Sequence, residues 1–268
     1  MSFSLFSLEQ FISELKLPLE SSDKDFIHYY RGCSTSDWNY NLIPGIYRGA
    51  HINDEASNFR EMIIRSPEEF KDDKTTLEKL VKMQHFSLPT RLLDITSNPL
   101  IALFFASGNF NNISTDGKVY VFKIRKNELK YYDSDSVSLV SNISKLKLEK
   151  TDFNKKLDHL IHEIREEKPY YSNDFESENK RDIVKVFPVR VKLNNNRIVR
   201  QSGAFLLFGI KDLSSKVEPA ILPTSEIVAE LIIDKGAKKS IRDSLNSLAI
   251  KESTLFPDLE HAASYLRM

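Results

Sequence analysis

The sequence predicts an α+β fold in which one mixed or largely antiparallel sheet packs with helices. Patterns typical of helices cluster early in the chain and patterns typical of strands cluster late, without the strict alternation of a doubly wound fold. The 268 residues contain no internal repeat and no Gly/Ser-rich or Pro-rich linker. Because such linkers mark domain boundaries, we expect a single domain over residues 1–268.

Capping signals and apolar periods define the elements of the first half. Ser7 and Gln10 have the spacing of a capping box, which predicts a helix to about Leu15. Residues 26–33 are rich in aromatic side chains and are typical of a strand. Residues 99–107 begin with proline and are mostly apolar, which predicts a short buried helix. We also expect a loop over residues 34–50 and helices over residues 53–65 and 73–85, the first capped by Asn53 or Asp54.

In the second half, strands surround a helical insertion. Residues 117–125 (GKVYVFKIR) are typical of a strand. Residues 126–182 resemble an inserted helical region, with a charged amphipathic helix over residues 152–167. Further strands are expected over residues 183–193, 203–210 and 226–233, and helices over residues 237–248 and 257–266.

Bulk composition excludes several classes of protein. Lys plus Arg and Asp plus Glu both number 38, so no net charge draws the chain to nucleic acid, and any such attraction needs a local basic patch. Cys33 is the only cysteine, which excludes an internal disulfide and a cysteine-based zinc site. The first residues lack the positive segment of a signal peptide, and no apolar run approaches the roughly 20 residues of a membrane span. We therefore expect a cytoplasmic protein with no membrane partner.

The most informative segment runs from residue 83 to residue 106, where polar side chains stand directly before an apolar stretch. An unpaired buried polar group costs a few kcal/mol, so these groups must bond to one another or to a ligand. In a structural corner, Arg91 would pair with Asp94, and Thr96 would cap the helix that begins at Pro99. In a ligand site, the same groups would line a pocket. The candidates in this segment are Gln84, His85, Thr90, Arg91, Asp94, Thr96 and Ser97.

Two further patterns are candidates for ligand binding. Tyr30-Arg31-Gly32 ends the first expected strand, and the forked guanidinium group of Arg31 can bind a phosphate or pair with a carboxylate at the edge of the core. Gln201 precedes a strand, and Gly203 shapes the turn there. The amide of Gln201 can orient a ligand hydroxyl or face water.

Charge and histidine patterns give weaker signals. Residues 180–200 carry seven Lys or Arg against Asp182 alone, as in a solvated face or in a ridge that holds an anion such as RNA. His159 and His162 share one face of the expected helix over residues 152–167, but no third ligand is evident. We therefore predict no metal site.

Together these motifs resemble those of the FRG domain, a bacterial and phage-associated family named for its Phe/Tyr-Arg-Gly motif. In this chain that motif is Tyr30-Arg31-Gly32, and residues 83–106 (MQHFSLPTRLLDITSNPLIALFFA) match the family's central pattern almost throughout. The other positions that fit the family's pattern are Trp38, Pro44, Arg48, Arg197, Gln201, Gly203, Phe205 and residues 256–259.

The FRG pattern is in turn similar to the motif order of ADP-ribosyltransferases of the Arg, Ser-Thr-Ser, Glu type. This resemblance implies an ADP-ribosyltransferase-like fold and NAD as a substrate. By motif, Tyr30, Arg31 and Gly32 would bind NAD, with Arg31 at its phosphates or its nicotinamide ribose. Thr96 and Ser97 would brace the pocket.

Gln201 stands where these enzymes carry a catalytic glutamate. A carboxylate stabilises the oxocarbenium-like sugar and holds the ribose 2′-hydroxyl, whereas an amide does the second and only weakly the first. Either Gln201 suffices for a slow reaction, or another acid serves, or the chain binds NAD without turnover. Asp94 is the best alternative acid, because pairing with Arg91 would keep it ionised. Glu230 is a weaker candidate.

The resemblance implies an intracellular effector, a toxin or phage-defence component, that transfers ADP-ribose from NAD to a macromolecule. Gln84, His85, Thr90 and Arg91 would line the NAD pocket. Tyr30, Trp38 or Phe105 would stack on nicotinamide. The sequence does not identify the acceptor: RNA or protein is the first expectation, and DNA and a small molecule also remain open. It does not identify an antitoxin or sensor chain that would control the activity either.

Two alternatives remain open. The first is a non-catalytic module that binds nucleic acid or a nucleotide, which the absent glutamate and the basic residues 180–200 favour. The second is a metal-free nuclease in which His85 acts as general base and Arg91 steadies the phosphate.

Overall fold

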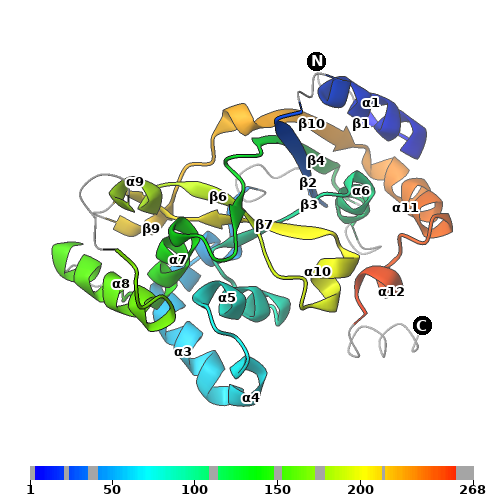
Figure 1. Cartoon of the computed structure of the whole chain (residues 1–268). Coiled ribbons are helices and arrows are strands. Elements are labelled where there is room, and N and C mark those ends of the chain that lie inside the picture. The colour runs from blue at the N-terminus through cyan, green and yellow to red at the C-terminus, as the bar shows by residue number, and fades with distance from the viewer. Residues whose placement is uncertain are drawn as a thin grey trace.

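Eight strands of this chain pair into one mixed sheet in the computed structural model (Figure 1). The structure describes residues 4–20, 24–35, 42–108, 114–147, 153–172, 179–212 and 215–257. The strands of the sheet are β1 (Ser4–Leu5), β2 (Phe26–Cys33), β3 (Leu92–Thr96), β4 (Gly117–Arg125), β5 (Lys130–Tyr131), β6 (Val186–Arg190), β7 (Gly203–Phe208) and β10 (Ile227–Ile233). They follow the order β1-β10-β4-β2-β3-β7-β6-β5, and the outermost pair at each edge is parallel while the inner pairs are antiparallel. The predicted α+β class with a mixed, mostly antiparallel sheet is therefore confirmed.

Helices pack against the sheet in two groups. The helices are α1 (Leu8–Glu20), α3 (Glu55–Arg65), α4 (Pro67–Phe70), α5 (Thr76–His85), α6 (Pro99–Ala106), α7 (Asp135–Asn142), α8 (Phe153–Glu167), α9 (Asn179–Ile183), α10 (Asn196–Arg200), α11 (Lys238–Ser247) and α12 (Glu252–Leu255). The helices α1, α6 and α11 lie beside β10, β4 and β2, whereas α3, α5, α7 and α8 lie together on the side of β7 and β6 (Figure 1). Each group buries its own hydrophobic cluster against the sheet.

Alternation along the strands separates these clusters from a third one. In β4, Val119 and Val121 pack with the group of α1, α6 and α11, whereas Tyr120 and Phe122 belong to a cluster on the other face of the sheet. That face also receives Tyr47 from the segment before α3. The central strands are therefore covered on both faces, and they carry the side chains at the ends of β2, β3 and β7.

Some elements escaped the sequence pattern. The strand β3 is short and lies directly after a turn, so its sequence resembles an extended loop rather than a strand. The helix α7 buries Ser138, Ser141 and Asn142 and thus has no clean apolar stripe. The expected strand over residues 183–193 is shorter, because Ile183 still belongs to α9, and α1 continues beyond Leu15 to Glu20. The helix expected over residues 257–266 lies outside the described residues except at its first position.

The predicted helical insertion, residues 126–182, contributes to the common core. It contains β5, α7, α8 and α9 in its described parts. The helix α7 contacts α5, and the 3-10 turn η3 (Ile143–Lys145) contacts α3. These contacts join the insertion to helices from earlier in the chain.

Candidate functional site

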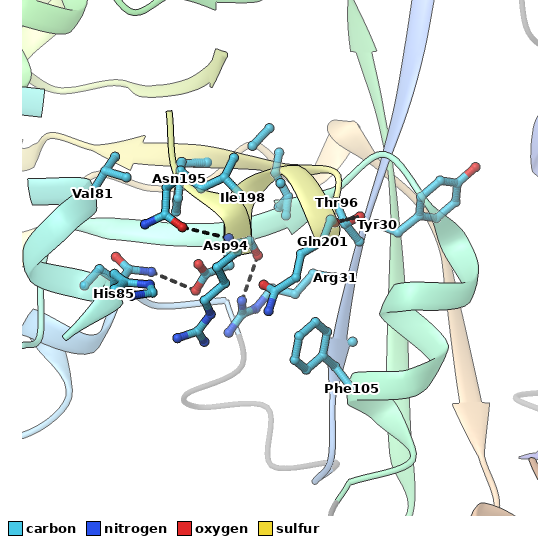
Figure 2. Close-up of a pocket in the computed structure, with 17 residues that line it drawn as sticks. Tyr30, Arg31, Val81, His85, Asp94, Thr96, Phe105, Asn195, Ile198 and Gln201 are labelled. Carbon is cyan, nitrogen blue, oxygen red and sulfur yellow. Dashed lines mark hydrogen bonds between the residues drawn. The ribbon is translucent and has the colours of Figure 1, made fainter. Parts of the chain in front are cut away.

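A pocket of about 300 Å³ lies over β2, β3 and β7, between the two groups of helices. Phe105 of α6 lines it on one side, and Val81 and His85 of α5 line it on the other (Figure 2). Ligand pockets in proteins begin at roughly this volume. The predicted site residues that line the pocket are Tyr30, Arg31, Gly32, Gln84, His85, Asp94, Thr96 and Gln201. The lining does not include Thr90, Arg91 or Ser97.

One row of residues across three strands brings the distant motifs together. Tyr30 of β2 pairs with Thr96 of β3, which in turn pairs with Gly203 of β7. Residues directly opposite each other in antiparallel strands point to the same face of a sheet. The Tyr-Arg-Gly motif, the end of the central motif and the Gln201–Gly203 turn therefore meet at one place.

Thr96 and Ser97 tie the end of β3 to the turn before β7. Thr96 Oγ1 donates a hydrogen bond to the carbonyl oxygen of Gln201 at 2.7 Å, and Ser97 Oγ lies 3.4 Å from the carbonyl oxygen of Ser202. The expectation that Thr96 caps α6 is wrong. Asn98 is the N-cap, and its Oδ1 accepts a hydrogen bond from the backbone N–H of Leu100 at 2.9 Å.

Arg31 lies where β2 and β3 part. In the described part of the chain these strands pair only through Tyr30 and Thr96. One position further along β2, Arg31 Nη1 donates a hydrogen bond to the carbonyl oxygen of Asp94 at 2.8 Å (Figure 2). Burial lowers the pKa of Arg48, and the neighbouring charge of Arg31 lowers that pKa further. Arg31 and Arg197 both line the pocket, and their guanidinium groups favour an anion such as a phosphate.

Asp94 is held by a relay of two side chains behind it. Thr90 Oγ1 donates to Gln84 Oε1 at 2.5 Å. Gln84 Nε2 donates to Asp94 Oδ2 at 2.7 Å, and Figure 2 marks this second bond at Asp94. An ionised carboxylate only accepts hydrogen bonds, so the amide of Gln84 can take only this orientation. Thr90 is buried and acts through Gln84, whereas the carboxylate of Asp94 stays exposed in the pocket.

Gln201 presents an acceptor to the pocket. Its Nε2 donates to the carbonyl oxygen of Leu255, the last residue of α12, at 3.2 Å. Because a carbonyl oxygen only accepts, the amide nitrogen must face Leu255, and Oε1 is left for the pocket. The side chain can therefore accept a hydrogen bond from a ligand hydroxyl, as the sequence predicts, but it brings no negative charge.

The end of α12 and Phe256 support one wall of the pocket. The guanidinium carbon of Arg197 lies 4.8 Å from the ring centroid of Phe256, and the rings of Phe256 and Phe105 meet edge to face with centroids 6.1 Å apart. Arg197 and Phe105 both line the pocket. Asn195 and Ile198 line it as well, although sequence reasoning missed them because they resemble an ordinary helix cap and an ordinary core residue.

The expected ion pair between Arg91 and Asp94 is wrong. Arg91 is fully buried and donates from Nε to Glu55 Oε1 at 2.9 Å and from Nη2 to Glu55 Oε2 at 2.5 Å. Its Nη1 donates to the carbonyl oxygen of Phe208 at 3.1 Å and lies 3.4 Å from Tyr47 Oη. Side chains three positions apart in an extended segment point to opposite faces, which keeps Arg91 from Asp94. Arg91 therefore fastens α3 and the segment before it to the sheet.

Gly32 allows the backbone of α6 to pack closely against β2. A Cβ atom at this position would lie 1.7 Å from the carbonyl oxygen of Ala102, which no side chain can satisfy. The glycine of the Tyr-Arg-Gly motif thus admits a helix backbone, and this close approach brings α6 and its Phe105 to the edge of the pocket.

Glu230, Lys185 and Lys192 do not line this pocket. Glu230 pairs with Lys118, with 3.1 Å between Oε2 and Nζ. In the basic segment, Lys185 pairs with Asp182 and Lys192 pairs with Glu78, which neutralises part of its charge. Trp38 lies outside the described residues.

The described ranges contain no group of three or more His, Cys, Asp or Glu side chains that could hold a metal ion. None of their helices combines the length and the apolar character that crossing a bilayer requires.

Comparison with known proteins supports the first part of the sequence interpretation. The model of the FRG domain matches residues 27–114, a range that contains α5, β3, α6 and all of β2 except Phe26. No curated protein and no solved structure matches the chain. The resemblance to ADP-ribosyltransferases therefore stays a prediction. The family match and the motifs that build the pocket lead to one conclusion: residues 27–114 of this chain match the FRG domain.

Proposed function

We propose that the protein transfers ADP-ribose from NAD to a macromolecule. The observation that carries the proposal is the row of Tyr30, Thr96 and Gly203, which places Arg31, Asp94 and Gln201 around one pocket. These three side chains offer a cation for phosphate, a carboxylate for a positively charged sugar and an acceptor for a ribose hydroxyl.

The reaction breaks the bond between the nicotinamide nitrogen and C1′ of its ribose. Nicotinamide leaves with the bonding electron pair, which neutralises its ring, and the ribose gains positive charge at C1′. A nucleophile of the acceptor forms the new bond at C1′ and loses its proton, so that ADP-ribosylated acceptor, nicotinamide and one proton result. Asp94 faces the developing charge, and Gln201 Oε1 accepts the hydrogen bond of the ribose 2′-hydroxyl.

The division of work between Asp94 and Gln201 makes the proposal specific. Asp94 is anchored through Oδ2 by Gln84, so its second oxygen is available to the sugar. Gln201 is anchored to Leu255 through Nε2. Asp94→Asn should therefore reduce nicotinamide release by about a hundredfold, the usual loss when one electrostatic partner of a transition state is removed. Gln201→Glu, which adds a carboxylate beside the same hydroxyl, should retain or increase the rate.

The decisive experiment uses NAD labelled in the ADP-ribose half, purified protein and cell lysate. Release of nicotinamide measures cleavage, and label on a macromolecule that is lost after protease or nuclease treatment identifies the acceptor class. Arg31→Ala and Gln201→Ala should abolish both signals. Arg200→Ala is the matched control, because Arg200 is exposed on α10 and does not line the pocket.

A binding module is the second candidate function, and the neutral amide of Gln201 favours it. In that case NAD or another nucleotide binds in an Arg31-dependent manner, with no nicotinamide released under any condition that the experiment samples. Full transferase activity in Arg31→Ala would exclude a mechanism in which Arg31 anchors NAD. The effector role in toxicity or phage defence, and any controlling antitoxin or sensor, rest on the resemblance of the motifs alone.

A further inference from the structure

A second cavity of about 310 Å³ adjoins the first. Val81 of α5 and Asn195 before α10 line both cavities, so the two lie side by side. Phe105 and Asp94 line the first cavity, and Tyr132 lines the second. A ligand with two ends joined by a linker suits two neighbouring cavities better than a single compact ligand does.

The second cavity combines apolar surface with charged groups. Leu77 and Val191 line it with carbon, and Tyr132 adds an aromatic ring over which Lys192 Nζ lies at 4.7 Å from the centroid. Lys192 also pairs with Glu78, with 2.6 Å between Nζ and Oε1.

The carboxylates differ in what they are free to bind. Asp73 is buried, and its Oδ2 lies 2.8 Å from Nζ of Lys82, so its charge is already matched. Asp72, next to it, is exposed at the rim and forms no ion pair with the described residues. Asp72 is thus the carboxylate that can accept hydrogen bonds from hydroxyl groups of a ligand.

The junction between the cavities carries a donor with a fixed direction. Asn195 Oδ1 caps α10 by accepting a hydrogen bond from the backbone N–H of Arg197 at 2.7 Å. The amide nitrogen of Asn195 consequently points toward the junction, on the side of His85 (Figure 2). An N–H donor at this place suits the phosphate oxygens of a linker.

We propose that the second cavity binds the adenosine half of NAD, so that one dinucleotide spans both cavities; this inference rests on the proposed function. A carboxylate is a usual partner of ribose hydroxyls in nucleotide sites, and Asp72 supplies it. Leu77, Val191 and Tyr132 receive the base, and the diphosphate crosses between Asn195 and Arg31.

Binding of the separate halves tests the proposal by calorimetry on the full chain. Nicotinamide mononucleotide probes the first cavity, adenosine monophosphate probes the second, and NAD probes both. Asn194→Trp fills the second cavity from its exposed rim, and Asp72→Asn removes its available carboxylate. Glu68→Gln is the control, because Glu68 is an exposed carboxylate nearby in sequence that lines neither cavity.

The expected result is a loss of about tenfold or more in affinity for NAD and adenosine monophosphate in Asn194→Trp, and a smaller loss in Asp72→Asn. Affinity for nicotinamide mononucleotide should stay unchanged in both variants and fall in Arg31→Ala. If Arg31→Ala weakens NAD binding and neither Asp72→Asn nor Asn194→Trp does, the adenosine assignment is overturned while the proposed function stands. If the unaltered protein binds neither NAD nor nicotinamide mononucleotide, the proposed function and the inference resting on it both fail.

Discussion

Removing the charge of Arg91 should destabilise the fold without touching the pocket. Arg91 has no exposed surface, and its partner Glu55 is 4% exposed. In Arg91→Met the carboxylate of Glu55 loses both of its guanidinium hydrogen bonds and stays buried. Removing one charge of a buried ion pair costs about 3–5 kcal/mol.

The size of that loss is large relative to the stability of a typical protein. The free energy of unfolding of a folded domain is about 5–15 kcal/mol, so a loss of about 3–5 kcal/mol is a large fraction of it. An exposed pair provides the contrast: Lys71 and Glu68 approach to 2.9 Å, but their side chains are 62% and 84% exposed. Lys71→Met should cost less than about 1 kcal/mol, because water screens such a pair.

Urea unfolding measures these differences, with the midpoint and slope fitted for each variant. The double variant Arg91→Met with Glu55→Leu should recover a large part of the loss, because an apolar pair replaces a buried ion pair at little cost. The double variant should also bind NAD as the unaltered protein does if Arg91 acts only in the fold. A loss below about 1 kcal/mol in Arg91→Met, or a double variant less stable than the single one, would refute the reasoning.

Three further predictions concern packing, the relay behind Asp94 and pH. Gly32→Ala should lower the free energy of unfolding by about 1–3 kcal/mol or more through overpacking, because its new methyl group would clash with the Ala102 carbonyl oxygen. Gly45→Ala is the control: its nearest neighbour would lie at an ordinary 3.5 Å, so the free energy of unfolding should change little. Thr90→Val removes the donor to Gln84 and should slow nicotinamide release about tenfold, while Thr90→Ser, which keeps the hydroxyl, should not; equal rates in both would contradict the relay. Burial and the nearby Glu128 raise the pKa of Glu226 from 4.5 to about 7, so the folded state retains a proton that the unfolded chain releases, and stability should fall as pH rises from about 4.5 to about 7. Glu226→Gln should flatten that part of the pH profile in thermal unfolding.

Much of the fold follows from local patterns that the sequence carries openly. The strand over residues 26–33 and the strand over residues 117–125 agree with the structure at both ends, because their apolar and aromatic side chains alternate between two buried faces. The helix that begins at Pro99 was also evident, since proline fits the first turn and the segment is almost wholly apolar. The helix α7 was not, because its buried serines and asparagine resemble a surface loop.

The candidate site likewise has residues that the sequence predicts and contacts that it does not. The sequence identifies part of the site, because each of these residues lies in a motif whose side chains suit ligand binding. These residues are Tyr30, Arg31, Asp94, Thr96 and Gln201. The partners of these residues could not be predicted, since hydrogen bonds to Leu255 or from Gln84 depend on segments that meet only after the chain folds.

The sequence by itself determined the fold class, the FRG motifs and the residue types that suit a phosphate-containing ligand. Only the tertiary structure decided which of those residues share a pocket. It directs Arg91 to Glu55 and Asp94 to the pocket, because the two side chains leave the chain on opposite faces of a sheet that is buried on both sides. It also places a second cavity beside the first. No local pattern reveals this arrangement, because Val81 and Asn195, which line both cavities, come from distant parts of the chain.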